Sequence, residues 1–499
     1  MSTTREHNGT DQPGHQHRWR ALWVTQLAGF MGLLDVSIVN VALPSIQRSL
    51  GASVAEVQWV VSGYALTFGL VLVAAGRLGD ALGRRRMFLV ALTGFVVTSA
   101  LCGAAPGASL LVAARLLQGV AAGMLTPQNS GLIQDLFRGP ERGKAFGIFG
   151  ATVGLSTAVG PVLGGLILTV ASGPDGWRWV FYVNVPIGLI ALVAAGRLVP
   201  PRQPAEGRVA TRIDIVGALL LGAAVLGVLL PVVQVESGGL GRLWSLFPAA
   251  LVLIVLFLYW ERWMVRWGRA PLLDTRLLSA TPGYPGGAAL ALVYFIGFSG
   301  IWLVFALYFQ HGLGYTPLQS GLAVTPFALG SATSAAVAGR LVARYGRWVT
   351  IVGLVLSAIG LTAAALVLCH APAASAGWSV ALPLLVAGVG GGAVISPNIT
   401  LTLECVRVEM AGAAAGALQT GQRIGSAIGT ATLAAVLYSV VAQRGGYSGA
   451  IAAALLTATG FVCLALLVAV LELRVRQRRA MQRREPDEAA VAQADVHRC

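Results

Sequence analysis

Gly76-Arg-Leu-Gly-Asp-Ala-Leu-Gly-Arg84 decides how this chain of 499 residues is organised, because its pattern of glycine and arginine occurs twice. It returns 263 positions later as Gly339-Arg-Leu-Val-Ala-Arg-Tyr-Gly-Arg347. Gly160 and Gly164 return in the same way, 265 positions later, as Gly425 and Gly429. Two separate patterns therefore give nearly the same offset, as expected when a chain contains two homologous halves in parallel orientation.

The composition places the chain in a membrane. Hydrophobic residues make up 56% of the sequence and charged residues only 11%, whereas a soluble domain carries about 25% charged residues. A helix needs roughly 20 apolar residues to cross a bilayer, and fourteen runs approach that length. The predicted spans are 21–43, 57–76, 87–105, 108–128, 145–170, 180–198, 213–233, 243–260, 285–309, 317–338, 348–369, 379–397, 411–440 and 448–472.

The spans group as six, two and six. Pro200–Arg208, rich in proline and charge, follows the sixth span, and residues 261–283 follow the eighth; such stretches are typical of boundaries. We therefore predict an all-α polytopic membrane protein with two pseudo-symmetric six-helix bundles. Its parts are a cytoplasmic tail (1–20), an N-terminal bundle (21–200), a linker with two inserted helices (201–283), a C-terminal bundle (284–472) and a basic cytoplasmic tail (473–499).

The positive charges predict the orientation. With the N-terminus in the cytoplasm, 29 of the 35 Arg and Lys residues fall in cytoplasmic segments, four in external loops and two within spans. This excess is what the positive-inside rule predicts when both ends are cytoplasmic. It also accounts for the net charge of +15. Nucleic-acid binding would instead require basic residues gathered on one soluble face.

The fifth predicted span contains a run of small residues, Gly150–Gly165. Glycine at four-residue intervals lets two membrane helices approach closely, and proline bends a helix. We predict that this helix forms a moving interface; an ordinary packing face is the alternative interpretation. The residues concerned are Gly154, Gly160, Pro161, Gly164 and Gly165.

Asp35 is the one carboxylate deep within a predicted span. An ionised carboxylate there costs about 2.5–3.5 kcal/mol, so such residues usually face a water-filled cavity or a partner. Capture and release of a proton is the functional interpretation of Asp35; bracing of a broken helix is the structural one. Arg115 and Arg423 are the two cations within spans. We expect Arg423 either to line the pathway or to pair with Asp35.

Several stretches resemble the major facilitator superfamily along nearly the whole chain. Gly76–Arg86 resembles its loop signature between helices 2 and 3, Arg115–Gly123 its helix 4 signature, and Gly150–Gly165 its antiporter signature in helix 5. Three further stretches resemble the fourteen-helix drug:proton antiporters of this superfamily, namely Leu34–Pro44, Gln58–Tyr64 and Trp177–Gly188.

The resemblance implies export of amphipathic drugs or antibiotics, driven by proton entry and alternating access. It implies proton coupling by Asp35 and Arg115, although Arg115 alone is equally compatible with a structural ion pair or with a side chain that reaches the interface. Export of one endogenous metabolite, such as an antibiotic, a siderophore or an amino acid, is the alternative function. The antiporter signature disfavours a proton-coupled importer.

The resemblance also implies that the loop with Gly76, Asp80, Gly83 and Arg84 stabilises one state of a cytoplasmic gate. From the residues alone, Asp80 can cap the following helix or pair with arginines across the gate, and the arginines can simply hold the loop in the cytoplasm. Ala343 stands where the second half would repeat Asp80, so any such gate contact is asymmetric.

Polar residues within spans are the candidates for the substrate cavity. They are Gln26, Asn40, Tyr64, Gln419 and Arg423. We expect no enzymatic activity, because H-E-x-x-H, P-loop and G-x-S-x-G sequences are absent, and we expect no metal and no cofactor beyond the proton gradient. The expected partners are a small amphipathic substrate, protons and the lipid bilayer of the cell membrane, without nucleic acid; the sequence leaves the oligomeric state open.

Overall fold

The computed structural model describes residues 13–171, 173–200, 214–233, 239–269, 271–279, 281–407, 410–444 and 446–496. All regular secondary structure in these ranges is helical. Twelve segments there are long and apolar enough to cross a membrane, and Ile215–Pro231 is a shorter apolar helix. With the 32-residue helix Gly139–Val170, these segments occupy the fourteen predicted positions, and the all-α, multi-pass fold is confirmed.

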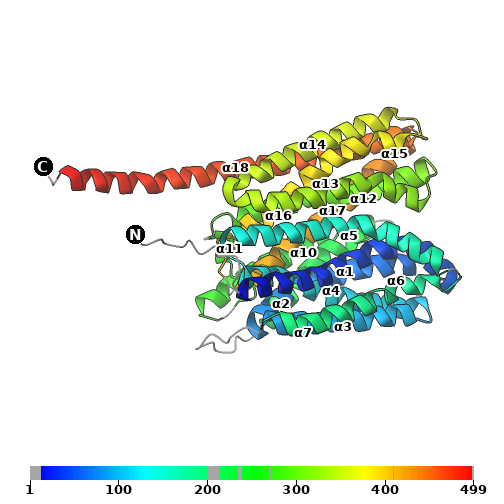
Figure 1. Cartoon of the computed structure of the whole chain (residues 1–499), viewed down its shortest axis with the longest axis horizontal. Coiled ribbons are helices and arrows are strands. Elements are labelled where there is room, and N and C mark those ends of the chain that lie inside the picture. Colours follow the sequence, from blue (N-terminus) through cyan, green and yellow to red (C-terminus); the bar gives the residue numbers. More distant parts are fainter. Residues whose placement is uncertain are drawn as a thin grey trace, which may run out of the picture.

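The helices follow the expected order of two similar halves with an inserted pair (Figure 1). The first half consists of α1 (Pro13–Leu50), α2 (Val54–Leu82), α3 (Arg84–Ala104), α4 (Ala108–Leu136), α5 (Gly139–Val170), η1 (Gly176–Arg178), α6 (Trp179–Tyr182) and α7 (Asn184–Leu198). The segment between the halves contains α8 (Ile215–Val233), α9 (Gly239–Arg242), α10 (Leu246–Arg266) and α11 (Arg276–Ser279). The second half consists of α12 (Tyr284–Leu307), η3 (Tyr308–Gly312), α13 (Pro317–Tyr345), α14 (Arg347–His370), α15 (Ala376–Ser379), α16 (Ala381–Thr402), α17 (Ala411–Arg444) and α18 (Tyr447–Val496).

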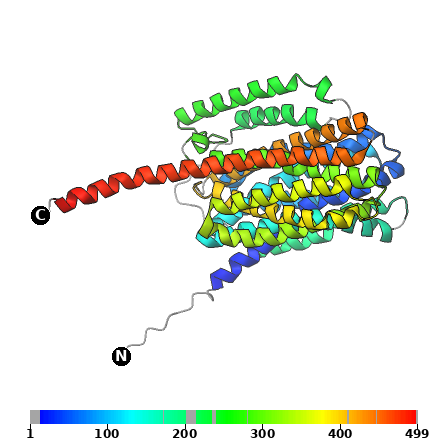
Figure 2. The ribbon, with the colours of Figure 1, turned by 90° about the horizontal axis from the view of Figure 1, so that it is seen from above.

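Two helix boundaries differ from the expected tails. α1 begins at Pro13, inside the stretch predicted as a polar tail. α18 continues past its membrane-length part, Tyr447–Gln477, to Val496, and extends well beyond the bundle in Figures 1 and 2. Figure 2 also places the inserted helices α8 and α10 along one side of the bundle.

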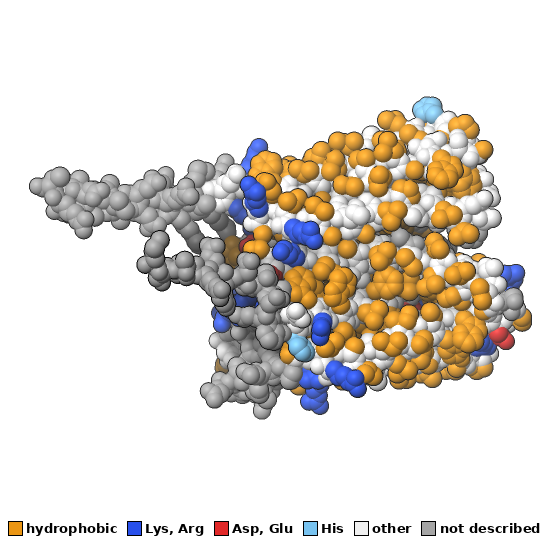
Figure 3. Space-filling model, in the orientation of Figure 1, with side chains coloured by type: hydrophobic (Ala, Val, Ile, Leu, Met, Phe, Trp, Pro, Cys, Tyr) orange, Lys and Arg blue, Asp and Glu red, His pale blue; other side chains and the backbone are white. Residues whose placement is uncertain are grey.

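The surface fits a position in a bilayer. Apolar side chains such as Val90, Leu219 and Leu251 are about half exposed or more, and Figure 3 shows apolar side chains over the flank of the bundle. Arg and Lys side chains gather at one end in this view. We call it the arginine-rich end; α2 gives way to α3 there at Gly83–Arg84, and α13 to α14 at Gly346–Arg347.

The repeated sequence produces repeated local structure. α2 and α13 both begin with a capping box, in which Ser53 pairs with Glu56 and Thr316 with Gln319. Gly83 and Gly346 end these helices with φ of +99° and +53°, a region that residues with a side chain rarely adopt. The two glycines are therefore required by the backbone of the turn.

Close glycine contacts join the two halves along what we call the seam, where α2 meets α17 and α5 meets α13. A Cβ on Gly412 of α17 would lie 2.6 Å from the carbonyl oxygen of Gly76 on α2. A Cβ on Gly339 of α13 would lie 2.6 Å from Cα of Gly147 on α5. Since Gly147 and Gly412 are 265 positions apart, the second contact is the pseudo-symmetric copy of the first.

Candidate functional site

Asp35 lies at the centre of a buried network in the first half. Its side chain is fully buried, and Oδ2 lies 2.5 Å from Nη1 of Arg115 on α4. Oδ1 accepts hydrogen bonds from Nε2 of Gln118, at 3.2 Å, and from Nδ2 of Asn184 on α7, at 3.0 Å. Every one of these neighbours donates, so the network is built for the ionised carboxylate.

Arg115 is held on all sides. Its Nε donates to the carbonyl oxygen of Val60, at 2.9 Å, and its Nη1 also donates to Oε1 of Gln118, at 2.8 Å. The guanidinium lies 4.2 Å from the ring centroid of Tyr64, whose hydroxyl donates to the carbonyl oxygen of Gly32. Arg115 therefore faces the interior as the ion-pair partner of Asp35, and it does not reach for the interface.

Gln118 and Asn184 are site residues that the sequence reasoning missed. Gln118 lies one turn after Arg115 and shares its face of α4. Asn184 lies within the stretch Trp177–Gly188 and also donates to Oγ of Ser99, at 3.1 Å. Both residues lie in stretches that the sequence analysis had quoted. Because their side chains are neutral amides, they do not stand out in an apolar span as a charged residue does.

The predicted ion pair between Arg423 and Asp35 is wrong, because Asp35 pairs with Arg115 instead. Among the residues that the structure describes, Arg423 has no ion-pair partner. Its guanidinium lies 4.1 Å from the ring centroid of Phe68 on α2. The guanidinium of Arg423 thus contacts the first half through the aromatic ring of Phe68.

Asp80 joins the halves at the arginine-rich end. Oδ1 accepts from Nη2 of Arg84, at 3.0 Å, and from the backbone N–H of Gly412, at 3.1 Å, while Oδ2 accepts from the N–H of Ala413, at 3.0 Å. Asp80 therefore caps α17, and the alternative that it caps the following helix is wrong. A carboxylate is favoured there because the first N–H groups of a helix carry partial positive charge.

Arg84 completes this contact within the first half. It forms a second ion pair with Asp135 of α4, at 2.9 Å, and it donates to the carbonyl oxygen of Gly131. Asp80 and Arg84 are both almost fully buried. The four predicted loop residues thus come together, with Gly76 in the backbone crossing and Gly83 in the turn.

In the second half, the arginine that corresponds to Arg84 has different ion-pair partners. Arg347, the copy of Arg84, lies 2.5 Å from Glu472 of α18 and donates to Asn398 at 2.6 Å. Glu472 also pairs with Arg476, at 2.9 Å. All four residues belong to the second half, so the predicted asymmetry of the two loops has a structural counterpart.

The glycines of α5 serve two neighbours. A Cβ on Gly154 would lie 3.2 Å from the backbone nitrogen of Ala332 on α13. Gly160 and Gly164 face α1 instead, and a Cβ on Gly164 would lie 3.1 Å from Cγ1 of Ile38. A Cβ on Gly165 would meet no heavy atom within 4 Å, so its placement at an interface is wrong. Pro161 belongs to α5, and its side chain lies outside the described residues.

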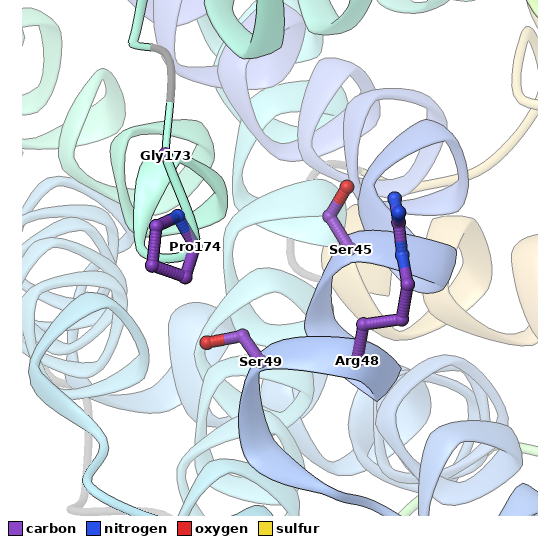
Figure 4. Close-up of a pocket in the computed structure, with 5 residues that line it drawn as sticks. All are labelled: Ser45, Arg48, Ser49, Gly173 and Pro174. Atoms are coloured by element: carbon purple, nitrogen blue, oxygen red, sulfur yellow. The ribbon is translucent and has the colours of Figure 1, made fainter.

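The remaining cavity candidates differ in environment. Gln26 donates to Oδ1 of Asn129, at 3.1 Å, and Gln419 donates across the seam to Oγ of Ser130, at 3.1 Å. The side-chain oxygen of each glutamine, Oε1, is buried and has no hydrogen-bond partner among the described residues. Asn40 is exposed. A separate shallow pocket lies at the end of α1 far from the arginine-rich end, lined by Ser45, Arg48, Ser49, Gly173 and Pro174 (Figure 4).

Two similar helical bundles, the first of which holds a buried acid–arginine pair, have the architecture of a multi-pass membrane transporter. The chain belongs to the Major Facilitator Superfamily, whose family model matches residues 26–292 and 287–494. This match confirms the predicted superfamily.

Relatives and a solved structure are similar over most of their length. The chain is 36% identical to the probable actinorhodin transporter of Streptomyces coelicolor over 83% of this chain and 71% of that one. It is 37% identical to the puromycin resistance protein pur8 of Streptomyces alboniger over 82% and 79%. The structure of the proton:xylose symporter XylE has a TM-score of 0.65, 14% identity and coverage of 92% and 96%; this likeness concerns the fold.

Proposed function

We propose that this chain exports drugs or antibiotics from the cytoplasm and that proton entry drives the export. Support comes from its superfamily, from relatives named for the transport of actinorhodin and for resistance to puromycin, and from the buried Asp35. The arginine-rich end faces the cytoplasm in this proposal, because short cytoplasmic loops carry the excess of basic residues. The described ends of the chain, Pro13 of α1 and Val496 of α18, lie on that side.

Asp35 is the proposed proton carrier, and the observation behind this role is the set of three donors around it. Arg115, Gln118 and Asn184 all donate hydrogen bonds to the carboxylate. A protonated Asp35 would have no acceptor for its own O–H among these three groups, and it would no longer compensate the charge of Arg115. Protonation therefore has to be accompanied by a rearrangement of the network. Since these donors come from α4 and α7, a proton on α1 would change the packing of three helices.

The glycine contacts of the seam are the proposed moving surface. Backbones that meet without side chains can separate without disengaging interlocked rotamers. The bonds from Gly412 and Ala413 to Asp80 would hold the arginine-rich end closed while the opposite end is open. Their release would accompany opening toward the cytoplasm.

Asp35→Asn tests the coupling. In acidified inverted vesicles, wild-type protein should release protons when an exported drug is added, detected with a pH-sensitive acridine dye. Asp35→Asn should reduce this signal at least tenfold, because an amide does not titrate. Asp175→Asn, on a side chain that is 66% exposed, is the matched control and should couple normally.

Two outcomes would contradict the proposal. Wild-type coupling in Asp35→Asn would remove Asp35 from the mechanism. Drug accumulation that is unaffected by expression of the wild-type protein, over a panel of dyes and antibiotics, would remove the efflux function. Resistance to one compound alone would instead favour the dedicated exporter of an endogenous metabolite.

A further inference from the structure

Arg423 is a cation at membrane depth without a carboxylate of its own. It lies in the middle of α17, is partly buried, and has no hydrogen-bond or ion-pair partner among the described residues. Its guanidinium lies 4.1 Å from the ring centroid of Phe68. A charge so placed is costly unless a partner or water compensates it.

The side chain points into the seam. Gln419 precedes Arg423 by one helical turn, so both lie on the same face of α17, and Gln419 bonds to Ser130 of the first half. Ile424 and Ala427, one residue and one turn after Arg423, pack with Leu66 and with the inserted helix α8. Arg423 therefore faces the first half, and α8 covers the neighbouring flank.

The charges around this position do not balance. The sequence holds 20 acidic residues, and of these only Asp35 falls in the middle of a span. Asp35 is already satisfied by Arg115 at 2.5 Å. The centre of the seam consequently carries one uncompensated positive charge, and an anion is the ligand that this field attracts.

Aromatic faces accompany this charge. Tyr64 and Phe68 lie one turn apart on α2, with ring centroids 6.1 Å apart. Arg115 lies over the first ring and Arg423 over the second. Oε1 of Gln419 is buried without a hydrogen-bond partner and can accept from a hydroxyl group.

We propose that Arg423, Phe68 and Gln419 form a binding site for an aromatic anion. A carboxylate or phenolate binds the guanidinium of Arg423, the aromatic part of the ligand lies near Phe68, and a hydroxyl group donates to Oε1 of Gln419. This proposal specifies the substrate class of the exporter and therefore rests on the proposed function. Cationic compounds are selected against, because no acidic side chain among the described residues of the seam pairs with Arg423.

Two dyes with the same xanthene ring and opposite charge test this selectivity. Fluorescein is an anion and rhodamine 123 a cation, and their binding to the purified full-length protein in nanodiscs is measured by fluorescence anisotropy. The wild-type protein should bind fluorescein about tenfold more tightly than rhodamine 123, the factor expected from one contact to a charged group. Arg423→Gln should abolish this preference, and Arg423→Lys should retain part of it.

Matched variants separate the site from general effects. Arg48→Gln removes an equal charge at the far end of α1 and should leave both affinities unchanged. Phe68→Leu should weaken the binding of both dyes while preserving the preference for the anion. If Arg423→Gln does not fold, the pair Arg423→Lys and Phe68→Leu still distinguishes charge from ring contact.

Equal binding of the two dyes by the wild-type protein would overturn the proposal. So would an unchanged preference for fluorescein in Arg423→Gln. The binding measurement needs no proton gradient, so its failure leaves proton-coupled export standing. Loss of proton coupling in the vesicle assay would leave the anion preference standing in turn.

Discussion

Gly76 and Gly412 meet backbone to backbone across the seam, with a Cβ on Gly412 only 2.6 Å from the Gly76 carbonyl oxygen. Gly339 and Gly147 repeat this crossing on the other side of the molecule. Gly160 and Gly164 contact α1, and their copies Gly425 and Gly429 contact the backbone of α12 in the corresponding way. The glycines of the internal repeat thus lie where helices cross closely.

Gly164 and Gly165 are adjacent and provide a matched pair. Gly164→Leu should reduce drug efflux at least tenfold, because the new side chain would collide with Ile38 of α1, while Gly165→Leu should transport like the wild type, because no atom lies within 4 Å of its Cβ. Efflux of a fluorescent substrate, normalised to the amount of protein in the membrane, measures both. Equal loss in the two variants would mean that α5 tolerates no bulk at all.

Asn184→Ala should weaken drug-driven proton release. The variant removes one of the three side chains that donate to the carboxylate of Asp35, and a hydrogen bond to a charged acceptor is worth about 1.5–3 kcal/mol. The dye signal in acidified inverted vesicles, normalised to the amount of protein in the membrane, measures the effect. A signal equal to that of the wild-type protein would remove Asn184 from the coupling network.

Asp80→Asn and Glu472→Gln should affect different parts of the molecule. The first weakens bonds to the start of α17, each worth about 1.5–3 kcal/mol when the acceptor is charged. Amide hydrogen exchange at residues 411–418 should accelerate in Asp80→Asn and stay normal in Glu472→Gln. Exchange at the start of α14 should show the reverse pattern, because Arg347 depends on Glu472.

Glu261→Gln should stabilise the inserted helices. Oε1 of Glu261 is buried without a hydrogen-bond partner, and both this atom and Oδ2 of Asp214 would contact a Cβ on Gly217. A glutamine nitrogen at this position can donate to Asp214, and the other oxygen can still accept from the N–H of Leu273. We expect a higher unfolding temperature in detergent for Glu261→Gln and a lower one for Glu261→Ala. A lower value for both would refute the contact with Asp214.

Charged residues were the part of the site that could be predicted from the sequence. Asp35 and Arg115 stand out because a charge in an apolar span is rare, and the twofold repeat gave the order of the halves. Gln118 and Asn184 carry no such signal. Gly165 was placed wrongly because consecutive residues of a helix point about 100° apart, and the rotation of α5 depends on its neighbours. The acid of the second half was missed because Glu472 comes from α18, far along the chain from Arg347.

The contact between Asp80 and the first turn of α17 has a kinetic consequence. If the halves rock apart at this end once per cycle, the two backbone bonds to Asp80 break and re-form at every turnover. The free energy needed to break these bonds then contributes to the activation barrier for the change between the two gate states. Stronger bonds would therefore slow the transport cycle. Because Ala343 stands where the second half would repeat Asp80, α13 adds no second carboxylate contact of this kind to that barrier.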